Sequence, residues 1–153
     1  MNFSQALNPN LIKANIESTE KIGAINELAD LLVKNYPQID KENLLNAVFK
    51  RETEMSTGIM THVALPHCRL NDVDDFIVCA GVSKKGIEYG SLDSMPVFFM
   101  TMLVVSEKGS DSHLTLLKDL CTIAKESEFF DELLQSKDSE QILEIIRKYE
   151  TKN

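Results

Sequence analysis

The sequence contains no tryptophan, four prolines and six glycines, and it lacks an apolar run long enough to cross a bilayer. Its most apolar stretch, from Met95 to Val105, is interrupted by Thr101 and falls short of the roughly 20 residues that a membrane-spanning helix needs. The first residues, Met1 to Ile16, lack the charged and apolar regions of a secretory signal. We therefore expect a protein that stays in the cytoplasm.

Cysteine is also scarce. Cys68, Cys79 and Cys121 form no Cys-x-x-Cys pair, which is the spacing of many zinc and redox sites, so reduced thiols are expected. Clusters of basic residues are missing as well, and 24 acidic against 16 basic residues give a formal net charge of −8. This charge disfavours a nucleic-acid partner and favours a basic protein partner.

What is present is typical of a soluble globular domain, with 43% hydrophobic and 26% charged residues. The length predicts a single domain, residues 1–153, and we find no repeat or linker. Apolar periodicity predicts helices over 18–36, 40–50, 113–125, 129–134 and 139–149, buried strands over 76–82 and 97–105, and a short edge strand at 87–89. Residues 1–16 fit no single pattern. Helices that flank buried strands predict a three-layer α/β/α sandwich, with helices on both faces of a small sheet.

Polar residues mark the expected helix starts. The candidate N-caps are Ser18, Asp40, Ser110 or Ser112, and Asp138, the last with Gln141 at the spacing of a capping box. Residues 150–153 are expected to fray. The methionines at 95, 100 and 102 are expected to fill the core.

The stretch from Arg51 to His67 carries the most chemistry. A polar turn containing glycine leads into an apolar segment that stops at Pro66, and His67 follows where a strand is expected to end. Pro66 fixes its own φ and favours an extended Leu65, so the backbone that presents His67 is stiff. An imidazole, whose pKa is ordinarily about 6.5, keeps a nucleophilic lone pair at neutral pH. From spacing alone, a hydrogen-bonded histidine without chemistry is the simpler interpretation.

A second interpretation is a metal site, because His62, His67, Cys68 and the acids Asp72, Asp74 and Asp75 are close in sequence. If residues 61–66 are extended, the side chains of His62 and His67 point to opposite faces, which disfavours a shared metal. A metal-dependent hydrolase remains the alternative from another class. Metal analysis of the purified protein would discriminate it.

The pairing Arg51-Glu52, the run Ser56 to Ile59 and the run Val63 to His67 together resemble the active-site segment of enzyme IIA domains of the sugar phosphotransferase system, fructose–mannitol class. Asp93 to Val97 and His113 to Leu117 fall where that class carries a turn with a strand and a helix headed by a second histidine. The class usually has small residues, often glycine, where this sequence has Met60 and His62.

The resemblance implies a mixed sheet and a phosphotransferase that needs no metal or organic cofactor. A phosphoryl group would pass from the phosphorylated carrier HPr to Nε2 of His67, and then to an enzyme IIB component and its membrane transporter for sugar uptake. His113 would donate to a phosphoryl oxygen and Arg51 would hold others. From the residues alone, His113 is equally a helix-cap or core-edge histidine, and Arg51 is more often a solvated helix-end charge. Thr57 is either a further donor or a turn stabiliser.

Two open points concern role and surface. The alternative function is that of a regulatory enzyme IIA, similar to the nitrogen type, whose phosphohistidine controls partner proteins. The sequence does not indicate which sugar would be transported. Because two proteins would reach one imidazole, we expect a monomer or weak associate with His67 in a shallow depression. Its apolar ring would draw on Ile59, Met60 and Leu65.

Overall fold

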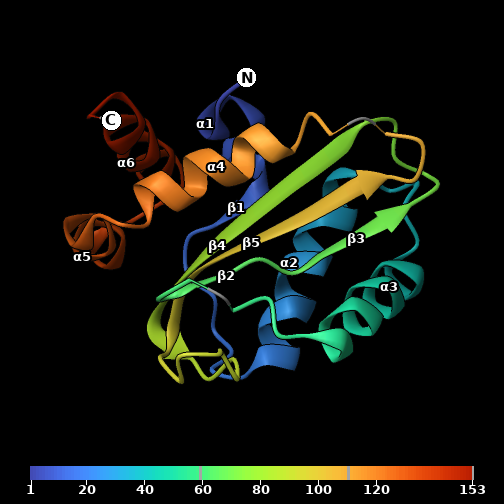
Figure 1. Ribbon diagram of the computed structural model, residues 1–153, viewed down its shortest axis with the longest axis horizontal. Helices are drawn as coiled ribbons and strands as arrows, with labels where there is room; N and C mark the ends of the chain where they lie inside the picture. The colour runs from blue at the N-terminus through green and yellow to red at the C-terminus, as the bar shows by residue number, and fades with distance from the viewer. Residues whose placement is uncertain (59, 110, 153) are drawn as a thin grey trace.

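A mixed five-stranded sheet lies between two layers of helices in the computed structural model, which describes residues 1–58, 60–109 and 111–152 (Figure 1). The sheet has three parallel pairings and one antiparallel pairing. β1 (Ile12–Lys13) pairs parallel with β4 (Phe76–Ile87), β4 pairs antiparallel with β5 (Val97–Ser106), and β2 (Val63–Ala64) and β3 (His67–Leu70) both pair parallel with β5. The predicted three-layer α/β/α sandwich with a mixed sheet is confirmed.

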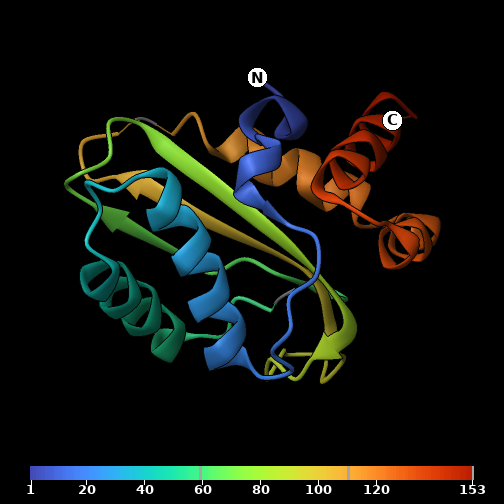
Figure 2. The same ribbon diagram turned by 180° about the vertical axis from the view of Figure 1, so that it is seen from behind.

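The two faces of the sheet carry different helices. One face is covered by α2 (Lys21–Asn35) and α3 (Lys41–Glu54), and the other by α1 (Phe3–Ala6), α4 (Leu114–Ile123), α5 (Ser127–Gln135) and α6 (Ser139–Lys152) (Figures 1 and 2). Successive residues of β5 serve opposite faces, because Leu103 packs with the α4 side and Val104 with the α2 side. Both central strands are therefore buried on both faces, as their continuous apolar runs predict.

The strand bounds differ from the prediction at the end of β4. Instead of stopping at Val82, β4 continues to Ile87 with an irregular register between the two residues, so the separate edge strand expected at 87–89 is wrong. Gly86 permits the irregularity because its φ of 90° is accessible to glycine at little cost. Its N–H donates to Ser83 Oγ at 3.0 Å.

Helices α2 and α3 begin in different ways. Ser18 does not cap α2: the N-cap is Glu20, and the Ser18 hydroxyl accepts a hydrogen bond from the Glu20 N–H at 3.2 Å. The predicted cap of α3 is confirmed, since Asp40 accepts from the Asn43 N–H at 3.0 Å. α3 also runs further than predicted, to Glu54, so Arg51 lies inside its last turn.

The later helices show similar shifts. His113 itself is the N-cap of α4, whereas the Ser112 hydroxyl donates to the Asp75 carboxylate at 3.3 Å; Ser110 lies outside the described residues. Asp138 accepts from the Gln141 N–H at 2.8 Å, as the capping-box spacing predicts. α6 continues to Lys152, so the fraying predicted for residues 150–153 is wrong for residues 150–152. Asn153 lies outside the described part of the chain.

The N-terminal segment, which the sequence left open, forms α1, a 3₁₀ turn η1 (Pro9–Leu11) and β1. The buried Phe3 ring packs edge-on against Phe99 with centroids 6.3 Å apart. The Phe3 N–H donates to the Asp119 carboxylate at 3.2 Å, and the Ser4 N–H donates to Glu150 at 2.9 Å. The first residues are thereby attached to α4 and α6, which lie far along the chain.

Two further sequence predictions concern apolar residues. Met100 and Met102 are fully buried, as expected of core residues, but Met95 is 45% exposed because it belongs to the loop before β5. Among the described helices, none combines the length and the apolar composition that crossing a membrane requires.

Candidate active site

His67 is the first residue of β3, whereas the sequence predicted that it follows the end of a strand. The edge of the sheet is interrupted at residues 65–66, between β2 and β3, and Pro66 has no N–H to donate to a strand ladder. The Pro66 carbonyl still accepts from the Leu103 N–H at 3.0 Å, so the break stays attached to β5. His67 pairs with Leu103 and is half-buried. Its backbone is thus held by the sheet on one side and by a proline on the other.

A backbone carbonyl decides which nitrogen of His67 carries the proton. The Nδ1 atom lies 3.0 Å from the carbonyl oxygen of Leu65. A carbonyl can only accept, so Nδ1 must be the protonated nitrogen in this contact. In the neutral ring, Nε2 is then the unprotonated nitrogen and holds the lone pair. The imidazole has the tautomer that a nucleophilic Nε2 requires.

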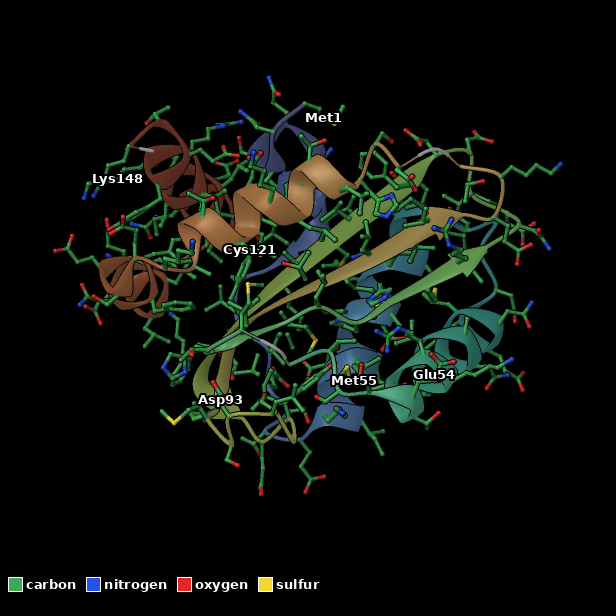
Figure 3. All side chains as sticks on the ribbon, in the orientation of Figure 1. Met1, Glu54, Met55, Asp93, Cys121 and Lys148 are labelled. Carbon is green, nitrogen blue, oxygen red and sulfur yellow. The ribbon has the colours of Figure 1, made fainter. Side chains whose placement is uncertain are left out.

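His67 lies in a cavity of about 440 Å³ between β3 and the end of α3. The charged residues that line it are Lys50, Arg51, Glu54 and Arg69, and Figure 3 shows Glu54 with its neighbour Met55 at this end of α3. One N–H of Arg51 donates to the Met55 carbonyl at 3.2 Å, which uses one of the five donors of the guanidinium. Three cationic side chains against one carboxylate suit an anionic ligand.

His113 lies on the same face of the sheet as His67. Paired residues of neighbouring strands point to the same face, so His67 shares the face of its partner Leu103, and Leu103 packs with the apolar side of α4. His113 heads α4 and is buried. Within the described residues, its Nδ1 has no hydrogen-bond partner. Arg51 lines the cavity around His67, whereas His113 is not among the residues that line it.

A family model decides the class of this chain. The model for the phosphoenolpyruvate-dependent sugar phosphotransferase system, EIIA 2, matches residues 5–149. The chain belongs to this EIIA family.

Two curated relatives agree with this assignment, and one solved structure matches the fold. The chain is 32% identical over 98% of its length to a "PTS system fructose-specific EIIABC component" of Bacillus subtilis, of which it spans only 24%. It is 25% identical to a "Nitrogen regulatory protein" of Pseudomonas aeruginosa over 94% of each chain. The fold also matches the enzyme IIAMTL chain in its complex with phosphorylated enzyme IIBMTL from Escherichia coli, with a TM-score of 0.76, 17% identity and coverage of 93% and 97%.

Thr57 of this EIIA domain stabilises a turn, which decides between the two roles considered from the sequence. Its hydroxyl is buried and donates to the Glu52 carboxylate at 2.7 Å. A hydroxyl has one proton to give, so Thr57 is committed to Glu52. In the sequence, Glu52 was recognised only as part of a motif, and the cavity residues Lys50 and Arg69 were not predicted. The period of two along a strand could have indicated Arg69, two residues after His67 and on the same face.

The apolar ring expected around His67 has a different arrangement. Leu65 is buried, Ile59 lies outside the described residues, and Met60 lines a second cavity of about 790 Å³. That cavity lies between the His62 turn and helices α4 and α5, where Figure 3 labels Cys121. The chain around His62 is a turn rather than the extended segment expected, and its φ of 66° is a conformation that glycine adopts more readily.

The metal interpretation finds no support in the site. Within residues 1–58, 60–109 and 111–152, no three His, Cys, Asp or Glu side chains are grouped so that they could hold a metal ion. His62 and His67 line different cavities. Burial raises the pKa of the Cys68 thiol to about 12, so this neighbour of His67 is protonated at neutral pH and is a poor nucleophile.

Proposed function

We propose that this EIIA domain accepts a phosphoryl group from phosphorylated HPr on Nε2 of His67 and passes it to an enzyme IIB component. The observation that carries the proposal is that His67 combines a lone pair on Nε2, left there by the 3.0 Å contact between Nδ1 and the Leu65 carbonyl, with a cavity lined by basic side chains. The basic side chains of Lys50, Arg51 and Arg69 line the same cavity and supply the charge that an incoming phosphoryl group needs.

In the transfer, the Nε2 lone pair attacks phosphorus in line with the bond that joins it to HPr. The new N–P bond forms as the old bond breaks, and the donor group of HPr leaves with the electron pair of that bond. The proton on Nδ1 stays in its hydrogen bond to Leu65, whose carbonyl dipole stabilises the charge that develops on the ring. Delivery to enzyme IIB follows the same course with His67 as the donor. A new bond forms between phosphorus and enzyme IIB as the N–P bond breaks, and the electron pair of that bond returns to Nε2.

Two side chains would stabilise the phosphoryl oxygens. Arg51 offers a planar fork that can bind two oxygens at once. His113 is buried with an unpartnered Nδ1 among the described residues, and leaving such a group unsatisfied costs roughly 1–3 kcal/mol. A phosphoryl oxygen within reach would remove that cost. The N-terminus of α4, which His113 caps, adds a favourable dipole for an anion.

The direct test is labelling of the purified protein with phosphorylated HPr, followed by mapping of the phosphorylated residue. We expect an acid-labile, base-stable label on His67 and its transfer to an enzyme IIB component of the fructose class. A protein that acquires no label, or carries the label on another residue, contradicts the proposal.

A regulatory role is the second candidate, supported by the nitrogen regulatory relative, which matches 94% of each chain. The fructose-specific relative has the higher identity, 32% against 25%, and favours the sugar role. Transfer of the label from His67 to enzyme IIB at a rate comparable to loading by HPr indicates sugar transport. Loading without such transfer, together with a partner that binds only one phosphorylation state, indicates regulation.

A further inference from the structure

Glu52, at the end of α3, is the centre of a buried polar cluster beside the His67 strand. Its Oε1 accepts from the Thr57 N–H at 2.9 Å and lies 2.8 Å from Lys21 Nζ, and its Oε2 accepts from the Thr57 hydroxyl at 2.7 Å. Tyr89 completes the cluster, with its hydroxyl 2.8 Å from the Thr57 hydroxyl and its ring under Lys21 Nζ at 4.5 Å. Glu52, Thr57 and Tyr89 are all buried.

The donors in this cluster can be assigned one by one. Burial raises the pKa of Glu52, but the hydrogen bonds from Lys21 and Thr57 outweigh it, and the net pKa lies below the usual value. Glu52 is therefore an ionised carboxylate that only accepts, and the Thr57 hydroxyl must give it its one proton. The Tyr89 hydroxyl must then donate to Thr57, and burial, the largest influence, raises the pKa of Tyr89 so that this proton stays in place. Each hydroxyl in the cluster has one orientation.

The backbone connects this cluster to His67 in two hydrogen bonds. The Thr57 carbonyl accepts from the Leu65 N–H at 3.1 Å, and the Leu65 carbonyl accepts from Nδ1 of His67 at 3.0 Å. The peptide units on both sides of Leu65 are thus attached, the first to Thr57 and the second to the imidazole.

The turn around Thr57 is also clamped from the other side. The Gly58 carbonyl accepts from the Leu92 N–H at 3.2 Å. A Cβ at Gly58 would stand only 2.3 Å from Ser91 Oγ and 3.1 Å from the Tyr89 ring, so this glycine is needed for the close approach. Movement of the turn away from Glu52 is therefore opposed by the 89–92 segment.

We infer that Glu52 and Thr57, oriented by Lys21 and Tyr89, are positioning residues that fix the Leu65 carbonyl and so hold His67 in the tautomer with an unprotonated Nε2. The inference rests on the proposed phosphoryl transfer for its functional meaning, but the tautomer can be measured without it. None of the four side chains needs to touch the phosphoryl group.

The size of the effect follows from the hydrogen bond at Nδ1. A net hydrogen bond of ordinary strength changes an equilibrium about two- to tenfold. Loss of the fixed carbonyl allows a corresponding share of His67 to carry its proton on Nε2, where the lone pair is no longer available. We expect phosphoryl exchange to slow by less than about tenfold, because the fraction of the competent tautomer falls by less than the equilibrium constant does, and the same imidazole is still present.

The experiment compares two buried threonines that differ in their partners. Thr57→Val removes the hydroxyl bound to Glu52, and Thr57→Ser restores it. The matched control is Thr101→Val in β5, because Thr101 is 2% exposed and its hydroxyl has no hydrogen-bond partner in the described part of the chain. The readouts are the ¹⁵N shifts of the His67 ring, which distinguish protonation at Nδ1 from protonation at Nε2, and the rate of phosphoryl exchange with HPr.

In wild type, Thr57→Ser and Thr101→Val we expect His67 to be protonated on Nδ1, and in Thr57→Val we expect a measurable population protonated on Nε2 with a slower exchange. The inference is overturned if wild-type His67 is protonated on Nε2, or if Thr57→Val folds and leaves both readouts unchanged. If Thr57→Val does not fold, Glu52→Gln takes its place, because an amide has one acceptor oxygen for three donors and must release part of the cluster. An unchanged tautomer in Glu52→Gln overturns the inference in the same way.

The two measurements test the inference and the proposed function separately. Failure of wild-type protein to accept a phosphoryl group from HPr contradicts the proposed function but leaves the ¹⁵N result valid. If His67 is phosphorylated but its tautomer does not change in Thr57→Val, the proposed function is supported and the positioning role of Glu52 and Thr57 is refuted.

Discussion

His62 and His67 are five residues apart and make the same hydrogen bond in different surroundings. Nδ1 of His62 lies 2.8 Å from the Pro96 carbonyl, and Nδ1 of His67 lies 3.0 Å from the Leu65 carbonyl. Both rings therefore hold a proton on Nδ1 and a lone pair on Nε2 when they are neutral. The tautomer alone does not decide which histidine is suited to carry a phosphoryl group.

The surroundings make the difference. His62 adopts a φ of 66° and packs against Phe98 and Phe130, with ring centroids 4.9 and 5.5 Å away, in the larger and mainly apolar cavity. His67 has a sheet backbone and shares a smaller cavity with Arg51 and Arg69. Transfer of a phosphoryl group depends mostly on positioning and on stabilising negative charge. Nearby cations, rather than cavity size or an accessible imidazole, therefore favour His67 over His62 as the proposed phosphorylation site.

The largest expected effect is the contrast between the two histidines. His67→Ala should abolish labelling by phosphorylated HPr, whereas His62→Gly should label within about twofold of wild type because it leaves the His67 site intact. Glycine also relieves the positive φ at position 62, so the fold should be kept. Quantitative labelling with radioactive phosphate measures both variants. Strong labelling of His67→Ala, or loss of labelling in His62→Gly, reverses the comparison.

A smaller effect is expected when the proposed donor His113 is lost. His113→Ala should slow phosphoryl exchange roughly ten- to a hundredfold, because a hydrogen bond to a charged oxygen contributes about 1.5–3 kcal/mol. The side chain is buried, so thermal unfolding must be recorded with the rate. An unchanged rate would reduce His113 to a helix-start residue. Complete loss of labelling in a folded variant would exchange the roles of His113 and His67.

Arg51→Lys tests whether positive charge alone, or also the planar guanidinium, is needed beside His67. Lysine keeps the positive charge but loses the planar fork, so we expect a rate about three- to tenfold lower, measured as exchange with HPr over a range of HPr concentrations. Arg147→Lys is the matched control, because Arg147 is exposed on α6, away from this cavity. If the two variants behave alike, charge alone is sufficient at Arg51.

The smallest effect concerns stability and pH. The folded-state pKa of Glu52 is lowered, so its contribution to stability is complete above the unfolded-state pKa of about 4.3 and is lost as pH falls through the folded-state value. Glu52→Gln should lower the free energy of unfolding by about 1–3 kcal/mol at pH 7, and the difference from wild type should shrink in acid. Urea unfolding at pH 7 and at pH 3 measures it. A difference independent of pH would mean that Glu52 is not ionised in the fold.

Local sequence patterns predicted most of the fold. The continuous apolar runs at 76–82 and 97–105 gave the two central strands, and Asp40 marked the start of α3. The start of β3 at His67 could not be read from the chain, because β3 exists only through its pairing with residues 103–106 of β5. The partner of Thr57 was hidden for the same reason, since Tyr89 is 32 residues away. That His67, His113 and Arg51 carry the chemistry stays a prediction.

The attachment of α1 to α4 and α6 has a consequence for the order of assembly. The contacts of Phe3 with Asp119 and of Ser4 with Glu150 join residues 116 and 146 positions apart, so they close long loops and raise the contact order of the chain. During synthesis the N-terminal segment emerges well before either acidic partner exists. The sheet with α2 and α3 draws only on residues 12–106, so it can assemble first. We therefore expect the helix layer that carries His113 to close after the sheet that carries His67 has formed, so that His67 has its backbone in place before His113 does.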